Sequence, residues 1–113
     1  MPPQPCAQEY VLEYIAKTSY RETEQGWILK SDPKISSSYK YNDLHEMMMN
    51  PKTDLEIIYG QLSQVFTPDV LDYMKYVGQL DETKIHRLEG AMHHLFLDRP
   101  LEFKDLVLKI LEN

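Results

Sequence analysis

The second half of the chain alternates between two kinds of hydrophobic pattern, and this alternation limits its possible folds more than any other feature. Residues 54–60, DLEIIYG, are β-branched and aromatic and end at a glycine, which predicts a buried strand that enters a turn. Residues 83–90, TKIHRLEG, predict a second short strand, with Ile85 and Leu88 as its apolar residues. A helical pattern follows each strand. The order strand, helix, strand, helix predicts an α/β fold with parallel strand pairing and helices packed on the sheet.

Proline and glycine mark the ends of these two predicted helices. The first helix, residues 67–78, has Thr67 at its N-cap, Pro68 at its first helical position and Gly78 just past its end. The last helix, residues 99–113, has a proline in its first turn. Its apolar residues recur at helical spacing: Phe103, Leu106, Val107, Ile110 and Leu111.

Two strands are too few for a self-sufficient parallel sheet. Both faces of such a sheet need helices over them, and both of its edges carry unpaired backbone groups. A complete domain of this class has more strands than this sequence provides. We therefore expect part of the fold to be absent.

The first half of the chain predicts helices separated by irregular backbone. Residues 8–17 place Tyr10, Val11, Tyr14 and Ile15 on one helical face. Residues 20–41 are polar and contain Gly26 and Pro33, so they are expected to form a loop or irregular crossing. Residues 41–51, YNDLHEMMMNP, predict a short helix.

Bulk composition narrows the classes of function. The 113 residues carry a net charge of −6, so the electrostatic footprint of a nucleic-acid-binding protein is missing. No apolar run reaches the length of a membrane span, and the first residues have no signal-peptide pattern. The only cysteine, Cys6, has no partner for an internal disulfide. We expect a cytoplasmic protein that binds neither nucleic acid nor membrane.

Two adjacent histidines stand where the last predicted strand ends, in the stretch LEGAMHHLFLDRP. With EIIYGQLS upstream, this stretch resembles the C-terminal end of the α/β-hydrolase fold, in which a turn after the last strand bears the catalytic histidine. The resemblance implies that residues 41–113 are the C-terminal part of the hydrolase core. Residues 1–40 resemble the tail of the cap, or lid, segment. The implied fold is a C-terminal fragment with two parallel strands and flanking helices.

The resemblance also assigns roles to individual residues. His93 takes the catalytic position, where an imidazole accepts the proton of a serine hydroxyl and later protonates the leaving group. His94, Trp27 and Ser63 are implied as substrate-binding residues. The alternatives are local hydrogen bonding for His94, ordinary packing for Trp27 and a polar turn residue for Ser63. Asp98 is expected at the start of the last helix. No cofactor and no metal site are expected, since adjacent histidines rarely face one ion.

This sequence departs from the hydrolase pattern at two points. Ser63 stands where many members of the family hold the catalytic acid, and a serine cannot orient an imidazole as a carboxylate does. The nucleophile motif G-x-S-x-G does not occur. We therefore expect a segment of a serine hydrolase that is inactive alone. Its partners are expected to be a missing N-terminal half and, in the intact enzyme, a small ester-like substrate. Ester, lactone, epoxide and halide substrates all remain open.

A second class of function fits the helical patterns alone. A small, mostly helical interaction or immunity-type protein would use the helices at 8–17 and 101–112 to cover a partner. Residues 55–60 would then continue a helix, and the histidine pair would have no catalytic role.

Overall fold

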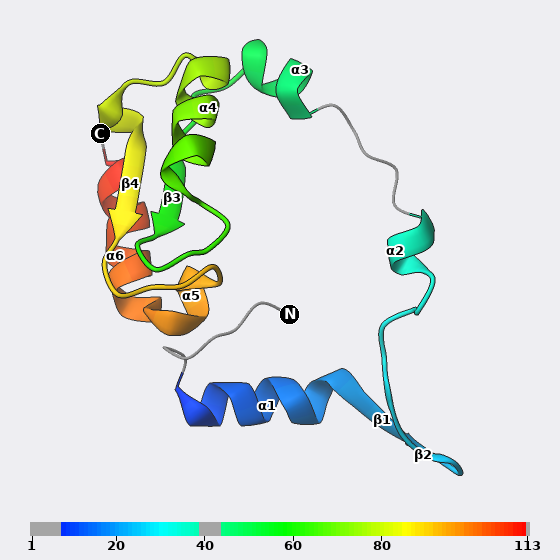
Figure 1. Cartoon of the computed structure of the whole chain (residues 1–113). Helices are drawn as coiled ribbons and strands as arrows, with labels where there is room; N and C mark the ends of the chain where they lie inside the picture. Colours follow the sequence, from blue (N-terminus) through cyan, green and yellow to red (C-terminus); the bar gives the residue numbers. More distant parts are fainter. Residues whose placement is uncertain (1–7, 39–43, 113) are drawn as a thin grey trace. The chain divides into compact units, whose positions relative to one another are not determined.

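A computed structural model describes residues 8–38 and 44–112 of the chain (Figure 1). The described residues fall into two compact units, 8–38 and 44–112, and each is treated by itself. The first contains α1 (Glu9–Ser19), β1 (Tyr20–Thr23), β2 (Gly26–Leu29) and α2 (Ile35–Ser38). The second contains α3 (Leu44–Met49), β3 (Ile57–Gly60), α4 (Pro68–Gly78), η1 (Glu82–Lys84), β4 (Ile85–Leu88), α5 (Leu95–Asp98) and α6 (Pro100–Leu111).

The first unit is a helix followed by a hairpin. Helix α1 confirms the predicted helix. The expectation of a loop over residues 20–41 is wrong where β1 and β2 pair antiparallel and where the short helix α2 forms. Residues 39–41 lie outside the described residues. Gly26 adopts a φ of +115°, a conformation that side chains disfavour, and the Thr23 hydroxyl donates to the Gly26 carbonyl at 2.7 Å. The strands have four residues each and the loop lacks the usual Asn-Gly or Asp-Gly signal, so the sequence pattern did not reveal the hairpin.

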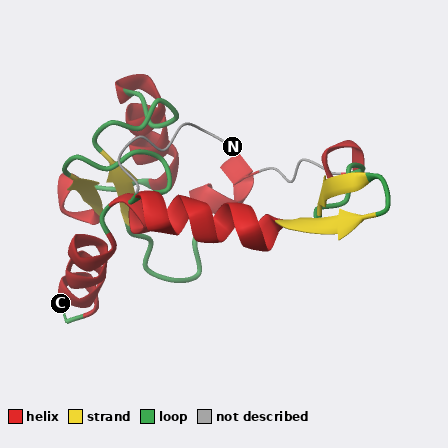
Figure 2. Ribbon diagram, turned by 90° about the horizontal axis from the view of Figure 1, so that it is seen from below, coloured by secondary structure: helices red, strands yellow, loops and turns green. Residues whose placement is uncertain are grey.

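The second unit is built on the predicted parallel pair of strands. β3 and β4 lie side by side in parallel, with Ile57 opposite Ile85 and Gly60 opposite Leu88. Helix α4 connects them, and α4 and α6 lie on opposite faces of the sheet (Figures 1 and 2). The expected α/β fold of two parallel strands with flanking helices is therefore confirmed. The helical alternative, which needed residues 55–60 in a helix, is wrong on this point.

The end of α4 differs from the prediction by one residue. Thr67 and Pro68 occupy the expected N-cap and first helical positions. Gly78 does not lie past the end but is the last helical residue. The left-handed conformation that stops the helix belongs to Gln79, with φ of 51°, and its N–H donates to the Tyr76 carbonyl.

The core of the second unit is small. The buried apolar side chains in the described part of the chain are Ile57, Leu71, Val77, Leu88, Ala91 and Met92. Helix α6 has an apolar stripe but no buried residue, and Leu111 is 76% exposed. Much of the surface of the sheet and of its helices therefore remains exposed among the described residues, as expected for a parallel sheet of only two strands. Within 8–38 and 44–112, no helix combines the length and apolar character that a membrane crossing requires.

Candidate active site

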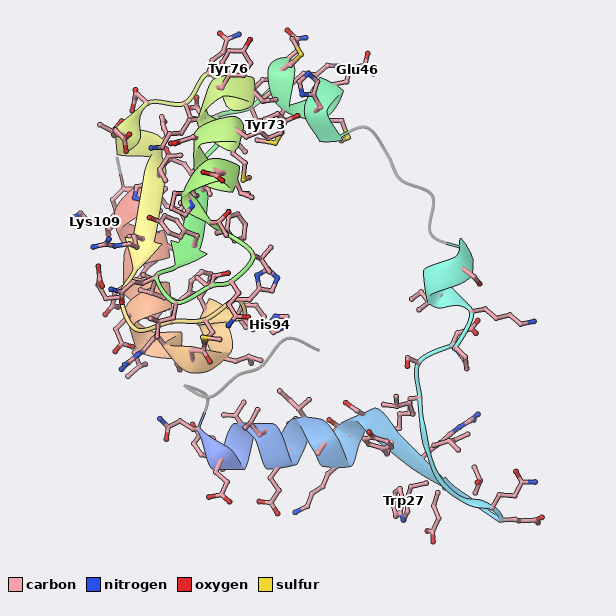
Figure 3. The ribbon with its side chains drawn as sticks, in the orientation of Figure 1. Trp27, Glu46, Tyr73, Tyr76, His94 and Lys109 are labelled. Carbon is pink, nitrogen blue, oxygen red and sulfur yellow. The ribbon has the colours of Figure 1, made fainter. Side chains whose placement is uncertain are left out.

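The histidine pair lies on a turn at the carboxyl end of β4, as predicted. Gly90, two residues after the end of β4, adopts a φ of +66°, and α5 begins directly after His94. The carboxyl ends of parallel strands are where open α/β sheets form their ligand sites. In Figure 3, His94 lies beside α5, beyond the ends of β3 and β4.

Backbone hydrogen bonds fasten this turn to the loop that follows β3. The Gln61 N–H donates to the Leu88 carbonyl at 2.9 Å, and the Leu62 N–H donates to the Ala91 carbonyl at the same distance. The side-chain oxygen of Gln61 accepts from the Gly90 N–H at 3.0 Å. The two segments that follow the two strands therefore form one connected structure at one end of the sheet.

A buried carboxylate supports the same turn from the other side. Asp98 is 3% exposed, and its Oδ2 accepts a hydrogen bond from the Met92 N–H at 2.7 Å. The expectation that Asp98 starts the last helix is wrong: Asp98 ends α5, and Arg99 is the N-cap of α6. The carboxylate instead holds the backbone of the residue before His93, where an unpaired N–H would be costly.

The His93 imidazole is half-buried, and its two sides differ. The Phe66 ring stacks on it with a centroid separation of 6.1 Å and an interplanar angle of 26°. The His94 ring meets it edge-on at 5.1 Å. The His93 Nδ1 atom is buried and has no hydrogen-bond partner among the residues that the structure describes. A buried polar atom without a partner costs free energy, so such atoms are rare in folded proteins.

The two histidine rings belong to a longer row of aromatic side chains. Consecutive rings in this row lie 5.1 to 6.3 Å apart between centroids, within the range of favourable aromatic contact. The row runs through Tyr59, Phe66, His93, His94, Phe96 and Phe103. No pattern in the sequence indicated this arrangement, because its members come from a strand, a loop, a turn and two helices.

Ser63 lies in the loop after β3, where its hydroxyl organises the backbone. It is 9% exposed, and its Oγ accepts from the N–H groups of Val65 and Phe66 at 3.3 and 3.4 Å. Its own N–H donates to the Gly60 carbonyl at 3.0 Å. The serine thus helps to place Phe66, whose ring stacks on His93.

Trp27 belongs to the first unit and lies on β2 (Figure 3). Its side chain is 65% exposed. Together with Ala16, Lys17 and Tyr20 it lines a cleft of about 450 Å³.

A second group of polar side chains lies at the opposite, amino ends of β3 and β4. The Glu56 carboxylate accepts from Lys84 Nζ at 2.7 Å and lies 2.6 Å from His86 Nε2. The hydrogen bond from Lys84, and then the one with His86, holds the pKa of the Glu56 carboxyl below its usual value, and the same contact raises the pKa of Lys84. The His86 side chain is 22% exposed, so this residue is partly buried at the sheet. In the part of the chain that is described, no three His, Cys, Asp or Glu side chains are arranged to hold a metal ion.

Comparisons with known proteins agree with this fold. No protein-family model and no curated protein matches the chain. Among solved structures, the crystal structure of E-2-(acetamidomethylene)succinate hydrolase superposes with a TM-score of 0.80 at 12% sequence identity. The match covers 96% of this chain and 41% of the hydrolase chain. The chain therefore has the fold of part of an α/β-hydrolase and spans about two fifths of the length of that protein.

Proposed function

We propose that His93 is the proton-transferring histidine of a serine hydrolase acting on ester-type bonds. The fold, which forms part of an α/β-hydrolase, is the starting point. The observation that carries this proposal is the buried His93 Nδ1 atom, which has no hydrogen-bond partner among the described residues. The imidazole stands on a braced turn at the carboxyl end of β4, where such a group would face a substrate.

The two ring nitrogens would have different tasks. In a serine hydrolase, Nδ1–H is held by a carboxylate, which fixes the orientation of the ring and stabilises the imidazolium. Nε2 takes the proton of the serine hydroxyl as this hydroxyl attacks the carbonyl carbon. The same proton then passes to the leaving alcohol. A catalytic histidine must be held in a fixed orientation. The hydrogen bond from Met92 N–H to Asp98 contributes to this by holding the backbone next to His93.

The nucleophile and the acid would come from a second polypeptide segment that carries the upstream part of the fold. The sequence contains no G-x-S-x-G motif, and Ser63 already accepts hydrogen bonds from backbone N–H groups. The edge of β3 that faces away from β4 has no strand partner in the described chain. A parallel strand added at this edge would bring a carboxylate toward His93 Nδ1.

Two further side chains are proposed to contact the substrate. The ring of His94 lies 5.1 Å from that of His93 and would help to bind the substrate near the reacting bond. Trp27 would contribute from the cap-like first unit. The net charge of −6 and the single cysteine favour a cytoplasmic enzyme that does not bind nucleic acid.

A chimera tests the proposal. The part of E-2-(acetamidomethylene)succinate hydrolase that the match does not cover would be joined to residues 1–113, or co-expressed with them if the fused chain does not fold. We expect a folded assembly, checked by circular dichroism and gel filtration, to hydrolyse p-nitrophenyl acetate. His93→Ala should reduce the rate by at least about a thousandfold.

The control substitution is His45→Ala on α3, which should leave the rate unchanged. A folded assembly that is inactive, or one that keeps its activity after His93→Ala, would contradict the proposed role of His93.

A further inference from the structure

A cavity of about 350 Å³ lies between α3 and α4, within the second unit. Its lining residues come from both helices and from the residue that ends α4: His45, Met49, Tyr76, Val77 and Gln79. Helix α4 leads from the carboxyl end of β3 toward the amino end of β4, so its last turn lies at the end of the sheet opposite the histidine turn. Figure 1 shows α3 and the end of α4 at the top and α5 at the bottom. The cavity is therefore separate from the proposed hydrolytic site.

The walls of this cavity are mainly apolar and aromatic. Tyr76 is 82% exposed and Met49 is 46% exposed, while Val77 is buried. The His45 ring stacks on the Tyr73 ring with a centroid separation of 6.0 Å, and His45 Nδ1 lies 2.7 Å from the Tyr73 hydroxyl oxygen. The volume lies within the range of small-molecule sites. The cavity thus offers an aromatic ring and a polarizable thioether to a small ligand.

The acidic side chains around the cavity favour a cation. One face of α4 carries two carboxylates and two tyrosines at helical spacing: Asp69, Asp72, Tyr73 and Tyr76. All four residues are exposed. Glu46 adds a carboxylate on the neighbouring helix α3 (Figure 3). The C-terminal end of α4 adds the partial negative charge of the helix dipole.

The basic residues near the cavity do not cancel this negative charge. Lys75 is the only lysine or arginine of α3 and α4. Its Nζ atom donates to the Glu82 carboxylate at 2.7 Å and lies 3.7 Å from an Asp72 oxygen, so its charge is already paired. Lys52 lines a separate cavity, which shares Gln79 with this one. A cationic ligand would therefore meet a negative surface.

We propose that this cavity binds the quaternary ammonium group of a small molecule. Such a group is a large cation with an apolar surface, so it can contact Met49 and Val77 while the carboxylates attract its charge. The ring of Tyr76 would add a cation–π interaction. A metal ion is a poorer fit, because no three His, Cys, Asp or Glu side chains in the described part of the chain are arranged to hold one.

Met49 provides the measurement, because it lines the cavity. The full chain would be labelled with carbon-13 at its six methionine methyl groups, and Met49→Leu would identify the Met49 signal. Tetramethylammonium chloride would replace sodium chloride at constant ionic strength and about pH 8, where free imidazole is uncharged. We expect a saturable shift of the Met49 signal with a Kd on the order of 1 mM. tert-Butanol, which has a similar shape but no charge, should bind at least about tenfold more weakly.

Substitutions of Tyr76 test the contribution of its ring. Tyr76→Ala should weaken the binding of tetramethylammonium by at least about tenfold, whereas Tyr76→Phe keeps the ring and should change it by less than about threefold. Tyr10→Ala is the matched control and should leave binding unchanged, since Tyr10 is 69% exposed but does not line the cavity. Because Tyr76 is 82% exposed, its variants should stay folded, which circular dichroism checks.

Four results would overturn the inference. Equal binding of tert-butanol would show an apolar cavity with no preference for charge. A Met49 signal that does not saturate, or binding that Tyr76→Ala leaves unchanged, would show that the ligand does not occupy the cavity. Binding of Nα-acetyl-trimethyllysine amide at least about tenfold tighter than that of tetramethylammonium would assign the ammonium group to a side chain of a partner protein. None of these results involves His93, so this test and the chimera test are independent.

Discussion

Gly60 and Met92 lie so close together that a β-carbon on residue 60 would overlap the Met92 carbonyl oxygen. The backbone at the end of β3 thus lies directly against the histidine turn. This contact, two backbone hydrogen bonds and the carboxylate of Asp98 determine where His93 is held.

Gly60→Ala should therefore displace the turn or unfold the unit. The new methyl group would meet backbone atoms, which do not move aside as a flexible side chain does, and the expected loss is about 3 kcal/mol in the free energy of unfolding. Urea denaturation followed by circular dichroism measures it. Gly78→Ala is the control, since the atoms nearest to its methyl group would belong to the side chains of Leu80 and Leu55, and it should change stability by less than about 1 kcal/mol. Equal effects of the two substitutions would contradict the close packing.

Asp98→Ala should weaken the histidine turn by removing the acceptor of the Met92 N–H. A buried donor left without a partner costs about 2 kcal/mol. Asp98→Asn keeps one carbonyl oxygen and should cost less. Hydrogen exchange of the Met92 amide gives the local readout and should accelerate most in Asp98→Ala. The control is Asp105→Asn, at an exposed ion pair, which should change stability by no more than about 0.5 kcal/mol. If the Met92 amide exchanges no faster in Asp98→Ala, the Asp98 carboxylate does not hold the turn.

His93→Phe should stabilise the isolated chain. The substitution keeps an aromatic ring beside Phe66 and removes a buried nitrogen that has no hydrogen-bond partner among the described residues, for an expected gain of about 1 kcal/mol. His86→Phe is the matched control and should destabilise the chain by about 1 kcal/mol, because it breaks the hydrogen bond to Glu56. Thermal unfolding of the two variants measures whether each substitution raises or lowers the stability. A destabilised His93→Phe would mean that Nδ1 is satisfied.

Acid should unfold the chain partly through Glu56. The pKa of this carboxyl in the folded chain lies below its ordinary value of 4.5, mainly because Lys84 donates a hydrogen bond to it. The unfolded state therefore binds a proton first. The stability that Glu56 contributes is fully present above the ordinary pKa and is lost as pH falls through the lowered pKa. Glu56→Gln should flatten the fall in stability below pH 4.5, as measured by urea unfolding at a series of pH values. The control is Glu102→Gln, because Glu102 and Arg99 lie 3.8 Å apart, and it should leave the fall in stability unchanged. If Glu56→Gln also leaves this fall unchanged, Glu56 does not contribute to acid unfolding.

The isolated chain should hydrolyse no ester through His93. The sequence lacks the G-x-S-x-G nucleophile, and a triad without its nucleophile loses nearly all of its rate advantage. The release of nitrophenolate from p-nitrophenyl acetate should be equal for the chain and for His93→Ala, and close to that of free imidazole at the same concentration. A faster rate that His93→Ala abolishes would reveal a nucleophile that the sequence does not show.

The local patterns of the sequence determined the order of elements in the second half of the chain. β-branched runs ending in glycine predicted β3 and β4, and Pro68 and Pro100 marked the starts of α4 and α6. The glycine after β4 and the proline at the start of α6 likewise predicted that His93 lies on a turn. These predictions held because hydrophobic period, proline and glycine act on the backbone within a few residues.

Only the tertiary structure decided which groups meet. Glu56 contacts His86 across 30 residues, and Asp98 turns back to Met92 instead of starting α6. That His93 Nδ1 has no hydrogen-bond partner among the described residues is likewise visible only once neighbouring segments are in place. Such contacts depend on strand register and on how separate segments pack against each other, and a pattern that repeats every two or four residues carries no information about either.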